Sequence, residues 1–253
     1  LIIMKSKKII ITSSWDDGHP LDIKLGKLLK KYSIKGTFYV PITNWANDSL
    51  NFQEIKQISR NFEIGGHTYN HSILTMVPEH RMNLELIQSK EKLEEITDQK
   101  IISFCYPLGQ YNEKIKELIK KAGYLGSRTS KIFKTNFSDT FEFHPTIHAA
   151  NRGLLSKGKG ILELTDFSHS SKLLFKGKIF KKWDEIAKES LKSVLKKGGI
   201  WHLWGHSWEI EEDKNWNSLE NLLRFVKEET EKYEIEFLTN GEIFERFSKK
   251  GEN

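Results

Sequence analysis

Short runs of β-branched and aromatic residues alternate along this chain with longer segments in which apolar residues recur at helical spacing. The first run covers residues 9–13, and the helical segment after it begins at Pro20 or Asp22 and ends at about Tyr32. Residues 37–40 form the next apolar run. Strands that alternate with helices are typical of parallel sheets, because each helix returns the chain to the edge where the next strand begins. The pattern therefore predicts an α/β fold.

The same alternation continues to the end of the chain, with one interruption. Further strands are predicted at residues 63–65, 103–106, 125–128, 200–204 and 236–238. Further helices are predicted at residues 52–61, 79–96, 113–122, 183–197, 219–232 and 242–249. Residues 148–179 are rich in Gly, Lys and Ser and show no clean period, so we expect a loop insertion there, of the kind that often carries a functional segment.

The composition indicates a single globular domain. With 253 residues, 38% of them hydrophobic and 11% aromatic, the chain can bury one sizeable core. The formal net charge of +6 comes from 40 basic and 34 acidic residues, and most of the lysines are spread along the predicted helices. Nucleic acid is therefore not an expected partner, because binding to phosphates requires clustered positive charge.

No stretch of the sequence has the roughly 18 consecutive apolar residues that a membrane span requires. Residues 1–8 also lack the order of basic and apolar residues that marks a secretory signal. Cys105 is the single cysteine, which excludes an internal disulfide and suits a reducing compartment. We therefore expect a cytoplasmic protein, and the sequence leaves its oligomeric state open.

Two pairs of side chains with the chemistry of a metal site follow predicted strands. Asp16 and Asp17 come just after the first strand, in the segment Ser-Trp-Asp-Asp-Gly, and His67 and His71 come just after the third. These side chains are expected to converge, because the carboxyl ends of parallel strands meet at one edge. Two imidazoles and one carboxylate can bind a borderline-soft divalent ion, and a second carboxylate can act as a base. The combination predicts metal-assisted hydrolysis.

Two later segments reach the same edge. Pro107 and Leu108 follow one predicted strand, and Trp204 and His206 end another. Each segment also has an ordinary structural interpretation. Asp-Asp-Gly after a strand is a common turn sequence, and His206 follows large apolar residues, as a core histidine paired with Glu209 would. The convergence of four segments on one edge favours a functional site.

Four short motifs resemble, in order and spacing, those of the polysaccharide deacetylases. These metal-dependent carbohydrate esterases share the domain of the nodulation-protein chitooligosaccharide deacetylase. The resemblance extends from about residue 9 to about residue 245 and implies a distorted (β/α) barrel with about seven strand-helix units. The matching motifs are Trp15-Asp16-Asp17-Gly18, His67-Thr68-Tyr69-Asn70-His71, Tyr106-Pro107-Leu108-Gly109 and Trp204-Gly205-His206.

The same resemblance implies a role for each matching residue. Asp16 would be the general base that takes a proton from the attacking water, and His206 would protonate the departing amine. The backbone N–H of Leu108 would stabilise the oxyanion. Zinc, or another divalent transition metal, would be the cofactor. The three metal ligands would be Asp17, His67 and His71.

One position departs from the family pattern. The third motif of the family begins with an arginine that pairs with the base aspartate, and Cys105 stands at that position here. Arg128, at the end of the following strand, is expected to reach the base aspartate from the neighbouring strand and to replace the missing charge. Two carboxylates, Asp166 and Glu209, are alternative partners for His206.

Tryptophans flank the predicted site. Trp15, Trp204 and Trp208, together with Pro107, are expected to contact the substrate, because aromatic faces stack on sugar rings and on flat acyl groups. Trp45 is expected in the core. The predicted function is removal of an acetyl group from an N-acetylated sugar. The alternatives are a cyclic amide or other acylated small molecule, an O-acetyl substrate, or a carbohydrate-binding protein with impaired catalysis.

Overall fold

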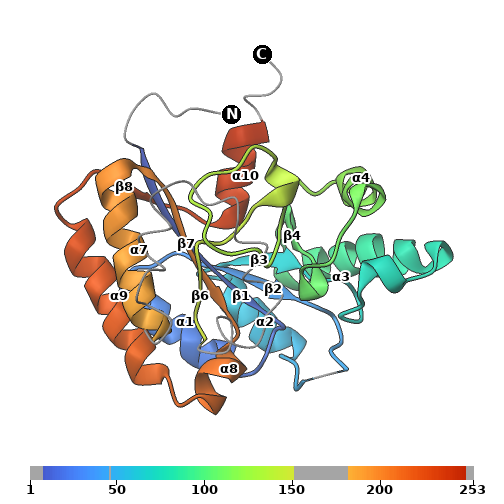
Figure 1. Cartoon of the computed structure of the whole chain (residues 1–253). Helices are drawn as coiled ribbons and strands as arrows, with labels where there is room; N and C mark the ends of the chain where they lie inside the picture. The colour runs from blue at the N-terminus through green and yellow to red at the C-terminus, as the bar shows by residue number, and fades with distance from the viewer. Residues whose placement is uncertain (1–7, 46, 151–181, 249–253) are drawn as a thin grey trace.

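The strands form one parallel sheet that curls around a central strand, β1 (Figure 1). The structure is a computed structural model that describes residues 8–45, 47–150 and 182–248. The strand order is β5-β4-β3-β2-β1-β7-β6, and β8 pairs with β1 outside this path. The strands are β1 (Ile9–Asp16), β2 (Thr37–Val40), β3 (Glu63–Gly66), β4 (Ser103–Cys105), β5 (Gly126–Arg128), β6 (Ile147–His148), β7 (Gly199–Gly205) and β8 (Ile235–Phe237).

Helices surround the sheet, with α7 packed on β6 and β7 and flanked by α9, while α10 lies near the N-terminal end of β1 (Figure 1). No helix in the described part of the chain is long and apolar enough to cross a membrane. The helices are α1 (Asp22–Lys31), α2 (Phe52–Ser59), α3 (Ser89–Thr97), α4 (Glu113–Lys121), α7 (Trp183–Lys197), α8 (Ser207–Glu212), α9 (Trp216–Thr230) and α10 (Asn240–Ser248).

β1 lies at the centre of the sheet, and all of its residues are buried. The three isoleucines at its start are typical of a parallel strand that is covered on both faces. Residues 9–15 pair with β7 along one edge of β1. On the other edge, residues 9–11 pair with β8 and residues 14–16 pair with β2. Because two strands share that edge one after the other, the sheet divides there and curls.

The predicted distorted α/β barrel is confirmed. Seven strands follow one another along the main path of the sheet, in agreement with the expected number of units. The curl is incomplete, because β5 and β6 end this path and do not pair with each other within the described residues. The carboxyl ends of the strands nevertheless face a common region, where the predicted site residues lie.

Three parts of the sequence-based interpretation need correction. The predicted helix at residues 79–96 is helical throughout, but it begins with a 3-10 turn at Glu79–Arg81 and contains a π-helical turn at Leu84–Gln88 before α3. His148 belongs to β6 and not to the predicted insertion, of which residues 151–179 lie outside the described residues. Helix α8 has no counterpart among the predicted helices, because six residues are too few for a helical period to emerge.

A half-buried carboxylate joins α10 to the strands at the opposite end from the predicted site. Glu63 accepts hydrogen bonds from Thr37 Oγ1 at 2.6 Å, from Ser103 Oγ at 2.7 Å and from the Gly241 N–H at 2.9 Å. A negative charge at the first turn of a helix is favourable, because it faces the positive end of the helix dipole. Gly241 is required here, because a Cβ atom at this position would lie 2.1 Å from Glu63 Oε1.

Substitution Gly241→Ala is expected to lower the free energy of unfolding by about 1–3 kcal/mol, because the methyl group displaces the Glu63 carboxylate. Urea denaturation monitored by tryptophan fluorescence measures the change. Glu245→Ala, at an exposed position of the same helix, is the control and is expected to change the free energy by about 0.5 kcal/mol or less. Equal effects of the two substitutions would contradict the proposed close contact.

Candidate metal and catalytic site

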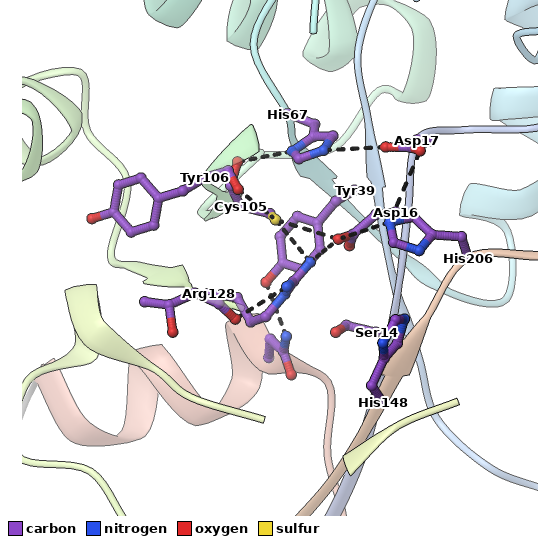
Figure 2. A network of polar contacts seen from close by, with 12 residues as sticks. Ser14, Asp16, Asp17, Tyr39, His67, Cys105, Tyr106, Arg128, His148 and His206 are labelled. Atoms are coloured by element: carbon purple, nitrogen blue, oxygen red, sulfur yellow. Dashed lines mark hydrogen bonds and ion pairs between the residues drawn. The ribbon is translucent and has the colours of Figure 1, made fainter. Parts of the chain in front are cut away.

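The carboxyl ends of four strands bring the main predicted site residues together (Figure 2). Asp16 ends β1, and Asp17 leaves the strand through a left-handed backbone conformation with φ of 78°. His67 follows β3, Arg128 ends β5 and His206 follows β7. Side chains that are far apart in the sequence therefore converge as the strand order requires.

Asp17, His67 and His71 form a compact buried cluster. Asp17 Oδ1 lies 3.1 Å from Nε2 of His71 and 3.5 Å from Nε2 of His67. The three potential ligand atoms lie within 4.8 Å of one another. Burial raises the pKa of Asp17, but hydrogen bonds from His67 and His71 outweigh this effect and hold the pKa well below its usual value. The carboxylate is therefore in the ionised form that binds metals.

Contacts behind the cluster direct the ligand atoms toward one another. His67 Nδ1 lies 2.8 Å from the carbonyl oxygen of Cys105, which can only accept, so Nδ1 donates and Nε2 is the atom left to bind a metal. Asp17 Oδ2 accepts hydrogen bonds from Trp208 Nε1 at 3.0 Å and from Asn47 Nδ2 at 3.4 Å. Oδ1 is thereby left to face the histidines. This donor set fits zinc or a similar divalent ion.

Asp16 contacts Arg128, the residue expected to reach it from the neighbouring strand. Arg128 Nη2 contacts Asp16 Oδ2 and lies 2.8 Å from Cys105 Sγ. The register of β4 with β5 places Cys105 beside Arg128, so the guanidinium occupies the space next to the cysteine. Burial lowers the pKa of Arg128, but the charge of Asp16 outweighs this effect and raises it. Asp16 Oδ1 has no hydrogen-bond partner among the described residues.

Glu209 connects His206 to a second histidine. Glu209 Oε2 lies 2.6 Å from His206 Nδ1 and 2.8 Å from His148 Nε2. Burial lowers the pKa of His206, but the hydrogen bond to Glu209 and the charge of Asp17 outweigh this effect and raise the pKa to about 9. His206 Nε2 is 3.9 Å from Oδ2 of Asp16 and equally far from Oδ2 of Asp17.

The sequence did not identify His148 as a site residue. It also did not decide which of the two expected carboxylates contacts His206. His148 reaches the site because β6 pairs with β7, where its partner in the register is Trp204. A strand of two residues has no periodic signal that could reveal this pairing. Glu209 contacts His206, whereas Asp166 lies outside the described residues.

Three of the residues predicted to contact the substrate are buried in the structure. Trp15 is fully buried and its Nε1 donates to Ser13 Oγ, so its ring packs in the core and cannot stack on a ligand. Pro107 is also buried. Trp204 is only 7% exposed, and its ring centroid lies 4.5 Å from the Arg128 guanidinium. Trp204 therefore supports the buried cation.

The remaining predicted contacts lie higher on the rim. Trp208 is partly exposed, although its Nε1 is bound to Asp17. Leu108 is 64% exposed and its backbone φ is 53°, and no described group accepts a hydrogen bond from its N–H. The prediction that Trp45 lies in the core is wrong, because Trp45 follows β2 in a connecting loop beyond the sheet and is 78% exposed.

Comparison with known proteins agrees with this geometry. Residues 4–126 match the family model for polysaccharide deacetylases. The matched residues, just under half of the chain, belong to the polysaccharide deacetylase family. The matched segment contains Asp16, Asp17 and both histidines of the cluster, whereas Arg128 and His206 lie beyond it. The family match therefore does not cover Arg128 and His206, and their contacts with Asp16 and Glu209 come from the structure.

The similarity to individual proteins is low in sequence and extensive in fold. The uncharacterized protein YlxY of Bacillus subtilis is 27% identical over 110 residues, which are 43% of this chain and 33% of YlxY, so the chain spans a third of that relative. A Mycobacterium smegmatis structure assigned as a polysaccharide deacetylase has 15% identity and a TM-score of 0.62, covering 98% of this chain and 93% of that chain. Bacillus subtilis PdaA, a family 4 carbohydrate esterase, has 18% identity and a TM-score of 0.55, covering 96% and 82%. These structures share the fold.

Arg128→Leu is expected to lower the free energy of unfolding by about 3–5 kcal/mol, because it leaves the Asp16 carboxylate buried without its partner. The double variant with Asp16→Asn is expected to recover part of this loss, since the unpaired charge is gone. Chemical denaturation measures both changes. The control is Arg246→Leu, which breaks a half-exposed pair with Glu236 and should cost about 1 kcal/mol or less. A similarly small cost for Arg128→Leu would argue against a buried ion pair.

Proposed function

We propose that this protein is a metal-dependent hydrolase that removes the acetyl group from an N-acetylated sugar. The proposal rests on one juxtaposition: the buried Asp-His-His cluster lies beside an ion-paired carboxylate and a carboxylate-bound histidine. Membership of the polysaccharide deacetylase family supports this class of reaction.

Asp17, His67 and His71 would hold the metal ion. A bound divalent ion such as zinc supplies a Lewis acid that polarises the acyl carbonyl and lowers the pKa of water toward about 7. The protein supplies the orientation of the ligand atoms, since a backbone carbonyl holds His67 and an indole N–H holds Asp17 from behind.

Asp16 is positioned to take the proton from the attacking water. Its Oδ2 is held by Arg128, whose positive charge stabilises the carboxylate. Its Oδ1 has no partner among the described residues and can accept the proton. The neighbouring Asp17 directs its own carboxylate to the histidines, so the two acids perform separate tasks.

His206 is positioned to protonate the departing amine. Because Nδ1 is bound to Glu209, Nε2 is the ring atom that faces the two aspartates. The imidazolium would transfer its Nε2 proton to the amine nitrogen as the C–N bond breaks. The backbone N–H of Leu108, which donates to no described group, suits an oxyanion donor, and one such donor typically contributes about 3 kcal/mol.

The family supports an acetylated carbohydrate as the substrate. Trp45 and Leu108 add exposed apolar surface to loops that follow β2 and β4, where a sugar ring could stack. An O-acetyl ester or a cyclic amide presents a carbonyl of related reactivity, so these substrates belong in the same assay. The competing outcome is a carbohydrate-binding protein that performs no turnover.

Asp17→Ala is expected to abolish stoichiometric zinc binding, because it removes the anionic ligand of the cluster. Elemental analysis after loading and dialysis should find about one zinc ion per chain in the unaltered protein and far less in the variant. The exposed carboxylate Asp98 provides the control, and Asp98→Ala should keep its zinc. Full zinc content in Asp17→Ala would place the ion elsewhere.

Asp16→Asn is expected to reduce acetate release by about 10²–10⁴-fold while zinc remains bound, because the variant cannot take the proton from water. Acetate release is measured on chitooligosaccharides and O-acetylated oligosaccharides, and ring opening on cyclic amides, each with added zinc. Saturable oligosaccharide binding by the zinc-loaded protein, without turnover of any of these substrates, would replace the hydrolase proposal by the binding function.

A further inference from the structure

The segment that carries the two metal-site histidines has an unfavourable backbone. Thr68 and His71 both have left-handed φ values, of 65° and 54°, although neither is glycine. Such conformations are uncommon for residues with a side chain, and a strained residue of this kind costs of the order of 1 kcal/mol. The surrounding structure must therefore hold the segment in the shape that brings both imidazoles to Asp17.

A single buried carboxylate provides most of that support. Glu85 is fully buried and belongs to the π-helical turn Leu84–Gln88. Its Oε2 accepts hydrogen bonds from the backbone N–H groups of Tyr69 and Asn70, each at 3.0 Å. Its Oε1 accepts from Asn70 Nδ2 at 2.9 Å and from Ser72 Oγ at 3.0 Å. All four donors lie between or next to the two histidines.

Other contacts extend this support to both sides of the segment. Thr68 Oγ1 donates to the His67 carbonyl at 2.6 Å and accepts from the Ser72 N–H at 2.8 Å. Thr43, beyond β2, donates through Oγ1 to Asn70 Oδ1 at 2.9 Å. The Asn70 side chain is therefore oriented by one acceptor and one donor, and it connects Glu85 to the β2 loop.

The charge of Glu85 distinguishes it from an ordinary structural residue. No lysine, arginine or histidine among the described residues forms an ion pair with it, and the donors named above are neutral. A buried carboxylate without a cation is costly, and hydrogen bonds from N–H and O–H groups are its compensation. π-Helical turns occur often at functional sites, where they displace a side chain from the regular helix face.

We propose that Glu85 is a positioning residue of the metal site, which holds the segment from His67 to His71 in its ligating shape before the ion binds. This inference rests on the proposed metal centre of Asp17, His67 and His71. Groups that orient metal ligands from behind typically change metal affinity by 10–100-fold. Loss of the Glu85 contacts should therefore weaken ion binding more than it weakens the fold.

Glu85→Gln is the sharpest variant, because it keeps the shape and changes one acceptor into a donor. The amide oxygen can replace Oε2 and accept from both backbone N–H groups. The amide nitrogen then faces two donors, Asn70 Nδ2 and Ser72 Oγ. The Ser72 hydroxyl can rotate to accept, and Asn70 can turn its amide and donate to Thr43 Oγ1, but Thr43 must then direct its own proton to the Tyr69 carbonyl, 3.5 Å away. The neutral amide also forms weaker hydrogen bonds than the carboxylate, so the support of the segment is weakened.

The experiment titrates the metal-free protein with Co²⁺ and follows its visible absorption, with Zn²⁺ competition against a chromophoric chelator as the second measurement. Glu85→Gln is expected to raise Kd for both ions by about 10–100-fold. Glu94→Gln is the matched control, because Glu94 also accepts a backbone N–H, from Ile101, but lies away from the histidines. The control should bind within about twofold of the unaltered protein, and thermal unfolding without metal verifies the fold of each variant.

The possible results separate the two proposals. If the unaltered protein binds no Co²⁺ or Zn²⁺, the metal centre of the proposed function is wrong. If it binds and Glu85→Gln binds equally well, or Glu94→Gln is weakened as much, the role of Glu85 is overturned. If Glu85→Gln does not fold, Ser72→Ala decides, because it removes a single contact to Oε1. Several-fold weaker binding by Ser72→Ala supports the proposal, and unchanged binding refutes it.

Discussion

Two consecutive carboxylates buried at the end of one strand are the constraint on which this site depends. Without separate partners, Asp16 and Asp17 would repel each other in a region of low polarity. The fold divides them, because the left-handed backbone at Asp17 turns its side chain to the histidines while Asp16 faces Arg128. The proposed metal ligand and the proposed base can therefore occupy adjacent positions in the chain.

Asp16 shows that a buried carboxylate in a parallel sheet can be paired from either of two neighbouring strands. Cys105 stands where the resemblance to the family leads one to expect an arginine, and Arg128 is its direct neighbour in the register of β4 and β5. Adjacent strands lie less than 5 Å apart, a distance that a long side chain easily spans. The guanidinium thus reaches the same carboxylate from the next strand, and Trp204 covers its other side. Charge at a site can be retained although its position in the motif changes.

Most of the fold was predictable because alternating apolar runs and helical segments are local properties of the chain. The strand at Thr37–Val40 and the helix at Trp183–Lys197 have the predicted bounds. The errors occur where tertiary contacts override the local pattern. The helix predicted at residues 79–96 is present, but it contains a π-helical turn that directs Glu85 to the histidine segment. Trp45 is exposed because it lies in a loop beyond the sheet, which its apolar character does not reveal.

The sequence alone determined the parallel α/β architecture and the identity of the residues at the strand ends. Asp17, His67 and His71 follow predicted strands, and the carboxyl ends of parallel strands meet at one edge. Only the tertiary structure decided which groups orient them. Glu85, Trp208 and the carbonyl of Cys105 come from other elements, and His148 comes from a strand of two residues. Hydrogen bonds between elements depend on side-chain direction and strand register, which no local pattern encodes.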